Sequence, residues 1–529
     1  MPNDCISYSK SGYFSGLIND YLQEKSEVKS LYNRFPKLEN FKAQIEEKQS
    51  NYTPEFRATL VEVLVKQNQS INLSESTQNN IQLLKNQNTF TVTTGHQLSL
   101  FTGPLYFLYK IISTIKLAQQ LKAEYPTFDF VPVYWMATED HDFEEISSFT
   151  FKGKKIHWNA QRKGAVGRLS TEGLPAVFEV FSQELGHGKN ADVIRELFQS
   201  AYVKHENLAQ ATRYLVNELF GAKGLVIIDG DEVLLKKQFA PYVQEELQKQ
   251  TAFTTVTETI QQLKGYHAQV NPREINLFYL EDNLRERIIY TDGKYQVNNT
   301  SLVFSEVEML ELLQKHPEKF SPNVIMRPLY QEVVLPNLAY IGGGGEIAYW
   351  LELKSYFKSQ KVTFPILVLR DSLVLSTEKQ LQKADKLQLT WSDFFLKQAD
   401  LVWLKTHQLS EFSIDLTNYK VQLQNQFAQL QALAKQTDAS FSGAVSAQEK
   451  KQLNGLDKLE KRLLKAQIRK QSEILERITT LQNELFPNQG LQERQLNFAE
   501  FYLEFGEGFF EKLFQAQNPL QLTFKMVSR

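Results

Sequence analysis

Four stretches of the sequence place reactive or ligand-binding residue types at the junction between a predicted strand and a helix. In the first, TVTTGHQLSLFTGPLY (residues 91–106), a β-branched run predicts a strand, and Pro104 favours the first turn of a helix. Gly95 allows the chain to turn between them. Because helix N-termini carry free amides and the positive end of a dipole, this junction suits a phosphate group. The phosphate-binding candidates are Gly95, His96, Thr102 and Gly103, and the neighbouring substrate-binding candidates are Thr94 and Gln97. A helix-start turn with a satisfied histidine is the alternative.

A second junction lies at PNLAYIGGGGEIAYW, residues 336–350. Here an extended segment that contains Tyr340 leads into four glycines and then a helix; the glycines are Gly342, Gly343, Gly344 and Gly345. Glycines let the backbone approach a ligand closely, so these four are further phosphate-binding candidates. Glu346 at the helix start favours the dipole and could contact an amine. The stretch lacks GxGxxG spacing, so a generic glycine loop is the alternative.

The third stretch, VPVYWMATEDHDFEEI (residues 131–146), follows a buried strand with five acids and a histidine within eight residues. These side chains could bind an amine, act as a base or hold Mg²⁺ through carboxylates. The catalytic candidates are Asp140, His141 and Asp142, and the substrate-binding candidates are Trp135 and Glu139. A solvated acidic loop with Asp140 or Asp142 capping a helix is the alternative. Zinc is disfavoured because no second histidine lies at helical spacing, and no protein metal site is predicted.

In the fourth stretch, SPNVIMRPLYQEVVLPN (residues 321–337), Arg327 follows an apolar run that predicts a strand. The planar guanidinium group can hold a carboxylate or a phosphate through two parallel hydrogen bonds. We therefore expect Arg327 to bind an anionic part of a substrate. A surface ion pair is the alternative.

The elements that must position these residues are predicted from short apolar runs that alternate with helical stretches over residues 89–372. The predicted strands are Phe90–Thr94, Phe130–Trp135, Gly224–Asp229, Asn276–Tyr279, Val324–Met326 and Phe364–Leu369. Strands that alternate with helices indicate an α/β fold with a mostly parallel sheet. Residues 1–372 therefore form the predicted core, which begins with a helical segment (residues 10–86) and carries insertions over roughly 150–320.

Strand signals nearly vanish between residues 373 and 485, where apolar residues recur at helical spacing. Two such series are Leu423, Phe427 and Leu430, and Ile474, Ile478 and Leu481. With the turn-prone segment 437–446 between them, the two series predict an α-helical antiparallel coiled-coil domain over residues 373–485. Apolar residues beyond a single seam favour a second chain, so we expect a homodimer through this domain. The aromatic tail, residues 486–529, is expected to return to the core.

Composition restricts the class of function. The 529 residues exceed the size of a single core, and 42% of them are hydrophobic. A net charge of −2 gives no overall attraction to nucleic acid or to a membrane, and no apolar run approaches the roughly 18 residues of a membrane span. The N-terminus lacks the pattern of a secretory signal, and Cys5 is the single cysteine. We therefore expect a cytoplasmic protein without intrachain disulfides.

One local charge pattern supports a different class of function. Residues 449–470 carry eight basic and three acidic side chains. A basic coiled-coil arm beside a nucleotide-binding core could bind tRNA or another polyanion without catalysing a reaction. A solvated helix face explains the same pattern, and nucleic acid is not the partner that we expect.

Together, the four stretches and the tail motif LFPNQGLQER resemble the BshC family, the cysteine ligases of bacillithiol synthesis. The resemblance runs in the same order over nearly the whole chain. It implies a Rossmann-like core with connecting-peptide insertions, similar to class I aminoacyl-tRNA synthetases, and a coiled-coil domain associated with dimers. It also implies an enzyme that joins L-cysteine to glucosaminyl malate through an amide between the cysteine carboxyl group and the sugar amine.

The implied reaction needs an activated acyl group, because amide formation from a free carboxylate is uphill in water. ATP-dependent adenylation of cysteine is the simplest route, and Mg²⁺ could accompany the nucleotide. The turn at residues 95–103 would then hold the phosphates. Asp140 or Asp142 would hold the cysteine ammonium group or accept a proton from the attacking amine. Arg327 would hold the malate carboxylates, and Tyr340 and Glu346 complete the expected substrate contacts.

Overall fold

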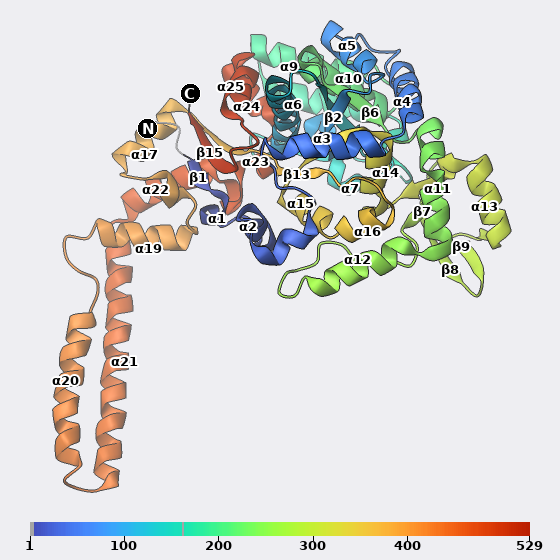
Figure 1. Ribbon diagram of the computed structural model, residues 1–529. Coiled ribbons are helices and arrows are strands. Elements are labelled where there is room, and N and C mark those ends of the chain that lie inside the picture. The colour runs from blue at the N-terminus through green and yellow to red at the C-terminus, as the bar shows by residue number, and fades with distance from the viewer. Residues whose placement is uncertain (1–4, 161–162, 529) are drawn as a thin grey trace. The chain divides into compact units, whose positions relative to one another are not determined.

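The computed structural model describes residues 5–160 and 163–528. These residues form two units (Figure 1). The core unit contains Cys5–Leu373 and Glu493–Lys525, and the helical unit contains Val374–Gln492 together with residues 526–528. The segment Glu493–Lys525 therefore belongs to the core unit, although the helical unit separates it from the rest of the core in the sequence.

A five-stranded parallel sheet forms the centre of the core unit. Its strands are β2 (Thr89–His96), β3 (Asp129–Met136), β6 (Val226–Asp229), β12 (Asn337–Gly342) and β13 (Ile366–Leu369). They lie in the order β13-β12-β2-β3-β6, and each neighbouring pair is parallel. From β2 the chain proceeds through β3 to β6 on one side, and it then returns to the other side of β2 to form β12. The carboxyl ends of β2 and β12 therefore flank a switch point, where open α/β sheets bind their ligands. The predicted α/β fold class is confirmed.

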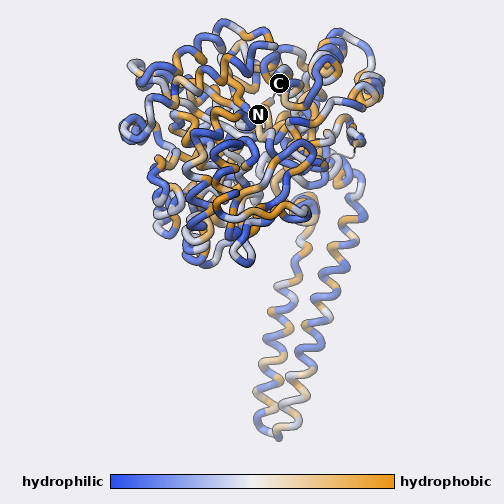
Figure 2. The backbone as a smooth tube through the Cα atoms, turned by 90° about the vertical axis from the view of Figure 1, so that its right-hand side faces the viewer, coloured by the Kyte–Doolittle hydropathy of each residue, from blue (hydrophilic) through white to orange (hydrophobic). Residues whose placement is uncertain are grey.

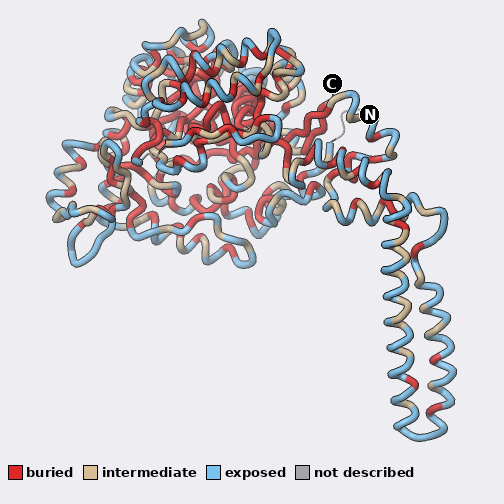
Figure 3. The backbone as a smooth tube through the Cα atoms, turned by 180° about the vertical axis from the view of Figure 1, so that it is seen from behind, coloured by how far each residue is buried: buried red, intermediate tan, exposed pale blue. Residues whose placement is uncertain are grey.

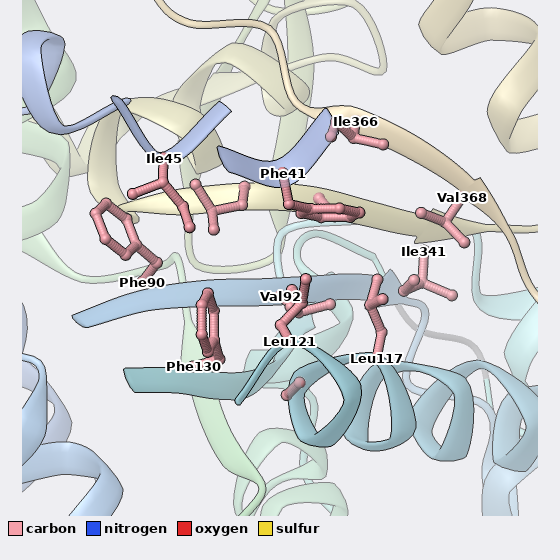
Figure 4. Close-up of a cluster of buried hydrophobic side chains, with 13 residues drawn as sticks. Phe41, Ile45, Phe90, Val92, Leu117, Leu121, Phe130, Ile341, Ile366 and Val368 are labelled. Atoms are coloured by element: carbon pink, nitrogen blue, oxygen red, sulfur yellow. The ribbon is translucent and has the colours of Figure 1, made fainter. Parts of the chain in front are cut away.

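Apolar side chains from strands and helices fill the core around this sheet (Figure 4). They come from the four strands β2, β3, β12 and β13 and from helices α3 (Asn40–Asn51) and α6 (Tyr106–Glu124). The labelled side chains are Phe41, Ile45, Phe90, Val92, Leu117, Leu121, Phe130, Ile341, Ile366 and Val368. Because α6 follows β2 closely in the chain, burial of its apolar stripe fixes the residues that link the two elements.

Further helices complete the core unit. Before β2 the chain forms α1 (Tyr8–Ser11), α2 (Gly16–Leu22), α3, α4 (Pro54–Gln67) and α5 (Glu75–Leu83). Helices α15 (Gly344–Leu351) and α16 (Lys354–Ser359) connect β12 to β13. After the helical unit, α24 (Phe498–Phe505) and α25 (Gly508–Ala516) precede β15 (Thr523–Ser528). Residues Thr523–Lys525 of β15 pair with β1 (Cys5–Ser7), so the two ends of the core unit are joined.

Two insertions interrupt the parallel sheet. The first, between β3 and β6, contains α7 (Phe143–Ile146), the hairpin of β4 (Ser148–Phe151) and β5 (Lys154–His157), α8 (Leu174–Leu185), α9 (Lys189–Tyr202) and α10 (Leu208–Phe220). The second, between β6 and β12, contains α11 (Val233–Lys249), α12 (Thr251–Gln262), α13 (Glu306–Lys315), α14 (Met326–Val334) and an antiparallel sheet of order β10-β9-β8-β7-β11. Its strands are β7 (Leu277–Glu281), β8 (Leu284–Thr291), β9 (Lys294–Val297), β10 (Val303–Phe304) and β11 (Phe320–Pro322). We call this sheet, with the loop before β7, the insertion arm (residues 271–304 and 320–322).

Two of the six predicted strands are placed differently in the structure. Asn276–Tyr279 overlaps β7, which belongs to the antiparallel sheet rather than to the parallel one. Val324–Met326 is not a strand, because the side-chain oxygen of Asn323 accepts hydrogen bonds from the amides of Ile325 and Met326 and starts α14. A side-chain cap of this kind outweighs the β propensity of a short apolar run. The corresponding strand of the parallel sheet is β12, further along the chain.

The helical unit contains α17 (Glu378–Lys386), α18 (Trp391–Phe394), α19 (Gln398–Gln408), α20 (Thr417–Ala434), α21 (Ala439–Lys470) and α22 (Ser472–Leu485). Helices α20 and α21 form a hairpin whose seam buries Phe427, Ala434 and Val445. Figure 3 shows that this hairpin is exposed along most of its length, and Figure 2 shows hydrophobic residues spaced along both helices. The predicted coiled-coil domain is confirmed.

The predicted first arm of this seam is confirmed for Leu423 and Phe427, but the predicted second arm and the predicted loop are wrong. Ile478 and Leu481 lie on α22, which packs against α17 and α19, and the residues opposite α20 come from α21. The loop is shorter than predicted, because the Asp438 side chain accepts a hydrogen bond from the Phe441 amide (2.9 Å) and α21 begins at Ala439. An N-terminal cap thus places the small, polar segment in a helix.

Candidate functional site

A cleft of about 590 Å³ opens at the carboxyl ends of β2, β3 and β12, at the switch point of the parallel sheet. The predicted site residues that line it are Gly95, His96, Gln97, Trp135, Glu139, Asp140, His141, Arg327, Tyr340 and Glu346. All four stretches of the sequence analysis contribute to this set. The insertion arm supplies further lining residues, which include Phe278, Arg285 and Arg287.

Gly95 lies where two side chains approach the backbone of β2. A methyl group on its Cα would come within 3.3 Å of the Tyr340 hydroxyl oxygen and 3.4 Å of Arg327 Nη1. Its carbonyl oxygen accepts a hydrogen bond from Lys110 Nζ. The sequence suggested that this glycine allows a chain turn. In the structure it lies within a strand, and the close approach of Tyr340 and Arg327 is what requires it.

The His96 ring lies at the end of the same strand, next to the rings of Tyr106 and Phe107 (5.4 and 5.0 Å between ring centres). Burial, reinforced by the positive charge of Lys110, lowers the pKa of His96 to about 3. The ring is therefore neutral at physiological pH. Its Nε2 has no hydrogen-bond partner among the residues that the structure describes. Such a ring can donate a hydrogen bond to a ligand or accept one from it, depending on its tautomer, but it cannot supply positive charge to a phosphate.

Acid should destabilise the protein through His96. The unfolded chain binds a proton at the ordinary imidazole pKa of ~6.5, whereas the folded state resists protonation down to about pH 3. The stability that the neutral ring contributes is complete above pH 6.5, and it falls by up to ~1.4 kcal/mol per pH unit below that. Denaturant unfolding at several pH values between 5 and 7 measures this slope. His96→Gln should have a shallower slope than the wild type, and an equal slope would show that another group is responsible.

A buried ion pair beside Gly95 joins α6 to α15. Lys110 Nζ lies 2.8 Å from Glu346 Oε1, and the Tyr340 hydroxyl donates a hydrogen bond to the same oxygen (2.8 Å). The other carboxylate oxygen accepts a hydrogen bond from the Gly343 amide (2.9 Å). Burial alone would raise the pKa of Glu346, but Lys110 and these hydrogen bonds lower it to about 2. Glu346 is therefore a fixed carboxylate whose charge Lys110 balances.

Asp140 is held at the cleft by hydrogen bonds to both carboxylate oxygens. Gln97 Nε2 donates to Oδ2 (2.8 Å), and the His141 amide donates to Oδ1 (2.8 Å). Gln97 Nε2 also donates to Glu145 Oε2 (2.8 Å). Both donors to Asp140 are neutral, so they orient its carboxylate without balancing its charge. An oriented carboxylate of this kind can hold an ammonium group or accept a proton from an amine.

Glu139, the neighbouring acid, belongs to an ion network. Its Oε1 lies 2.6 Å from Lys236 Nζ, which also lies 3.3 Å from Asp231 Oδ1. Arg168 donates two hydrogen bonds to Asp231 (2.7 and 2.9 Å). Burial raises the pKa of Glu139 in spite of the Lys236 charge. Because Lys236 is its ion-pair partner, Glu139 has a structural role at the edge of the cleft, and Asp140 is the acid with unbalanced charge.

His141 is bound to the insertion arm. Arg285 Nη1 donates a hydrogen bond to His141 Nδ1 (2.6 Å), which requires a neutral ring with its proton on Nε2. Burial and the Arg285 charge lower the pKa of His141 accordingly. The ring also packs against Phe278 (5.5 Å between ring centres). With Nδ1 occupied and Nε2 protonated, His141 can donate a hydrogen bond to a ligand but is not arranged to act as a base.

Arg327 lies on α14, and its guanidinium group reaches the cleft next to Gly95. Nη1 donates to Gln331 Oε1 (3.1 Å), and Nη2 is buried without a hydrogen-bond partner in the described part of the chain. The group lies 5.9 Å from the centre of the Tyr340 ring. A buried, unpaired donor at the switch point is suited to an anionic group of a ligand.

Comparison with known proteins identifies the family. The N-terminal Rossmann-like domain of bacillithiol biosynthesis BshC matches residues 1–371, and the C-terminal coiled-coil domain of BshC matches residues 373–529. A protein of Flavobacterium johnsoniae named "Putative cysteine ligase BshC" is 61% identical over the full length of both chains. Proteins of the same name from Cytophaga hutchinsonii (98% of each chain) and Bacillus cereus (94% of this chain, 95% of the other) are 36% and 30% identical. The chain belongs to the BshC family. The resemblance predicted from the sequence is confirmed.

Two predicted residues of this BshC protein face the C-terminal segment instead of the cleft. Thr102 and Gly103 lie in a turn before α6, where Asn497 Nδ2 donates hydrogen bonds to the carbonyl oxygens of Phe101 (2.8 Å) and Gly103 (2.7 Å). The Leu105 amide donates to the Leu496 carbonyl oxygen (2.9 Å). The Leu105 amide, a donor at the start of α6 where we expected a phosphate, is therefore already bound within the protein.

Other predicted residues of the BshC protein also lie outside the cleft lining. Gly342 ends β12, Gly343 precedes α15, Gly344 lies against Phe14, and Gly345 is exposed. Asp142 is exposed at the N-terminus of α7, and its side chain caps no amide of the described residues. The Thr94 hydroxyl donates to the Ile341 carbonyl oxygen (2.8 Å) and joins β2 to β12. Of the glycines, Gly343 acts on the cleft through Glu346, whose carboxylate its amide fixes.

Basic residues at the cleft of the BshC protein were not predicted from its sequence. They are Lys110, Arg273, Arg285 and Arg287. Lys110 lies in an apolar helical stretch, where a single lysine is the one signal of a buried charge. The arginines lie on the insertion arm, and the available signal is the two-residue spacing of Arg285 and Arg287, which places them on one face of a strand.

The BshC cleft does not fit a metal ion held by the protein. Within residues 5–160 and 163–528, no group of three or more His, Cys, Asp or Glu side chains is arranged to hold one. Both carboxylate oxygens of Asp140 already accept hydrogen bonds.

No helix among the described residues is long and apolar enough to cross a membrane.

Proposed function

We propose that this protein is a cysteine ligase that forms an amide between the carboxyl group of L-cysteine and the amine of glucosaminyl malate. The observation that carries the proposal is the 61% identity, over the full length of both chains, to a relative that bears a cysteine ligase name. The cleft supports it, because a volume of about 590 Å³ at a switch point suits small-molecule substrates. We also propose that the reaction takes place in the cytoplasm.

We propose ATP as the source of activation. An oxygen of the cysteine carboxylate would attack the α-phosphorus of ATP, and the bond to pyrophosphate would break. The amine nitrogen would then attack the acyl carbon of the adenylate, and AMP would leave as the amine loses a proton. We expect Mg²⁺ to enter with the nucleotide phosphates, because the described residues offer no ligand set of their own.

The cleft residues have distinct roles in this proposal. Arg327, whose guanidinium group lies next to Gly95 and keeps Nη2 unpaired, would bind the anionic group at the reacting centre. Asp140 would hold the cysteine ammonium group or accept the proton that the amine loses. His96 and His141 are both neutral, so they would contribute hydrogen bonds rather than charge.

A direct test incubates the purified full-length protein with L-cysteine, glucosaminyl malate, ATP and Mg²⁺ and follows products by mass spectrometry. The proposal expects a product with the summed mass of the two substrates minus one water, together with AMP and pyrophosphate. Omission of ATP is the control for activation, and L-serine in place of cysteine is the control for the acyl substrate. ADP and phosphate as products would reject adenylation, and the absence of any amide product would reject the ligase.

We propose that the protein is a homodimer held by the hairpin of α20 and α21. A groove of about 700 Å³ on this hairpin is lined by Tyr419, Leu423, Leu456 and Leu459 among polar side chains. Tyr419 is 62% exposed, Leu459 is 54% exposed, and Leu433 of the same hairpin is 53% exposed. Apolar side chains repeated along an exposed helical hairpin favour a partner helix.

Replacement of residues 421–456 by a short Gly-Ser linker should give a monomer whose core unit still folds. The cut ends are adjacent, because Lys420 forms ion pairs with Asp457 (2.7 Å) and Glu460 (2.6 Å) across the hairpin. Sedimentation at micromolar concentration compares the two proteins, and circular dichroism checks their folding. A shortened protein that stays dimeric, or a wild type that is monomeric, contradicts the hairpin interface.

A further inference from the structure

The cleft carries an excess of positive charge. The guanidinium groups that line it belong to Arg273, Arg285, Arg287 and Arg327. Of the three acids in the lining, Glu139 is balanced by Lys236 and Glu346 by Lys110. The four guanidinium groups therefore meet one uncompensated carboxylate, that of Asp140, and none of the four forms an ion pair within residues 5–160 and 163–528. Arg285 and Arg327 are partly buried, and a partly buried charge without a protein partner is costly unless a ligand supplies one.

Arg285 is held in place by neutral groups. Nε donates to Ser321 Oγ (3.1 Å), Nη1 to His141 Nδ1 (2.6 Å), and Nη2 to the Pro322 carbonyl oxygen (3.2 Å). The guanidinium group also lies over the Phe278 ring, 4.0 Å from its centre. A guanidinium group has five N–H donors, so two donors of Arg285 are left for a ligand. A fixed orientation with uncompensated charge is well suited to an anion.

Two further arginines share this part of the cleft. Arg287 follows Arg285 by two residues on β8, so both side chains leave the same face of the strand. Arg273 lies in the loop before β7 and lines the same cleft. Arg273 and Arg287 are exposed, and their side chains make no hydrogen bond to other described residues. Three guanidinium groups on one arm can hold two carboxylates at once.

We propose that Arg273, Arg285 and Arg287 form a dicarboxylate subsite that holds the malate half of the acceptor. The identity of the acceptor rests on the proposed function. The sequence had assigned these carboxylates to Arg327, but Arg327 lies beside Gly95 at the switch point between β2 and β12. Nucleotides bind at the switch point of such sheets, so Arg327 is left for the activated carboxyl group and its nucleotide.

The subsite directs the amine of the acceptor toward Asp140. The His141 ring links the Asp140 carboxylate to Arg285, because its Nδ1 lies 3.7 Å from Asp140 Oδ1 and accepts the Arg285 hydrogen bond. An acceptor with its carboxylates on the arm therefore has its other end near the group that can take the proton of its amine.

Titration calorimetry of the full-length protein with L-malate and, separately, with ADP tests the subsite. Arg273→Gln and Arg287→Gln each remove one guanidinium group from an exposed side chain. Lys294→Gln is the matched control, because it removes a positive charge from β9 of the same arm, outside the cleft lining. We expect each arginine variant to bind L-malate about tenfold more weakly, the scale of one charge-assisted hydrogen bond, with ADP affinity unchanged. Lys294→Gln should bind both ligands as the wild type does.

Unchanged malate affinity in both arginine variants would overturn the proposal, as would a wild type that fails to bind L-malate at millimolar concentration. Loss of ADP affinity without loss of malate affinity would assign the arm to phosphates and would also overturn it. Thermal unfolding checks that each variant folds.

The ligase assay separates the two proposals, because arginine-dependent malate binding without an amide product keeps the subsite and rejects the reaction. Where product forms, each arginine variant should raise the KM for glucosaminyl malate about tenfold and leave the KM for ATP unchanged.

Discussion

Asp140→Asn should lower kcat for amide formation about 100-fold, the usual scale for the loss of a positioned acid or base. The substitution keeps the size of the side chain and removes the carboxylate charge that Gln97 and the His141 amide orient without neutralising. Without this charge, the cleft loses both a partner for the cysteine ammonium group and an acceptor for the proton of the attacking amine. Steady-state kinetics at saturating cysteine and ATP measure the effect.

Asp142→Asn is the matched control for this prediction. It makes the same change two residues later, on an exposed side chain outside the cleft lining, and should stay within about twofold of the wild type. Wild-type rates in both variants would make the acidic stretch a solvated loop. Equal losses in both would attribute the effect to the charge of the whole stretch rather than to Asp140.

Lys110→Met should destabilise the folded protein by about 3 kcal/mol, the lower end of the range for removing one partner of a buried ion pair. Lys110 is 1% exposed, whereas the Glu346 side chain keeps 28% exposure, so solvent relieves part of the cost. The variant also removes the donor to the Gly95 carbonyl oxygen. The pKa of Glu346, about 2 in the wild type, should rise, because burial then acts without its main opposing charge. Denaturant unfolding at neutral pH measures the loss of stability.

Lys122→Met provides the comparison on the same helix. Lys122 also forms an ion pair, with Asp129 at 2.8 Å, but its side chain is 50% exposed, so its loss should cost less than about 1 kcal/mol. A second variant, Lys110→Met combined with Glu346→Gln, should recover part of the stability, because it leaves no buried carboxylate without a partner. Equal losses for the two single variants would show that burial of the Lys110–Glu346 pair does not decide its contribution.

The parallel sheet could be predicted because its strands are short apolar runs between helical stretches, a pattern that local sequence carries. The Val324–Met326 prediction failed because a three-residue apolar run does not distinguish a strand from the first turn of a buried helix. The deciding interaction is one side chain, Asn323, which accepts hydrogen bonds from two amides. Such a cap is visible in the sequence only as an asparagine, a residue type that is common in loops as well.

The cleft was predictable where its residues lie at or just after the carboxyl ends of parallel strands, as Gly95 and Asp140 do. Lys110 and the arginines of the insertion arm were not predictable, because their role depends on partners that are distant in the sequence. Lys110 meets Glu346, 236 residues away, and Arg285 meets His141, 144 residues away. The turn at Gly103 shows the converse: its local pattern suits a phosphate, but the Leu105 amide at the start of α6 already donates a hydrogen bond to the carbonyl oxygen of Leu496, which is distant in the sequence.

The core unit contains residues from both ends of the chain, and this affects the order of events during translation. β1 pairs with β15, buried Arg370 forms an ion pair with Glu493 (2.7 Å), and Asn497 closes the turn before α6. The ribosome makes β1 and Arg370 long before it makes their partners. The helical unit is synthesised between the two segments of the core unit, so it can fold before the core unit is complete. A translation product that stops within the helical unit leaves Arg370 without its carboxylate, so the core unit is completed only after the segment Glu493–Lys525 has been made.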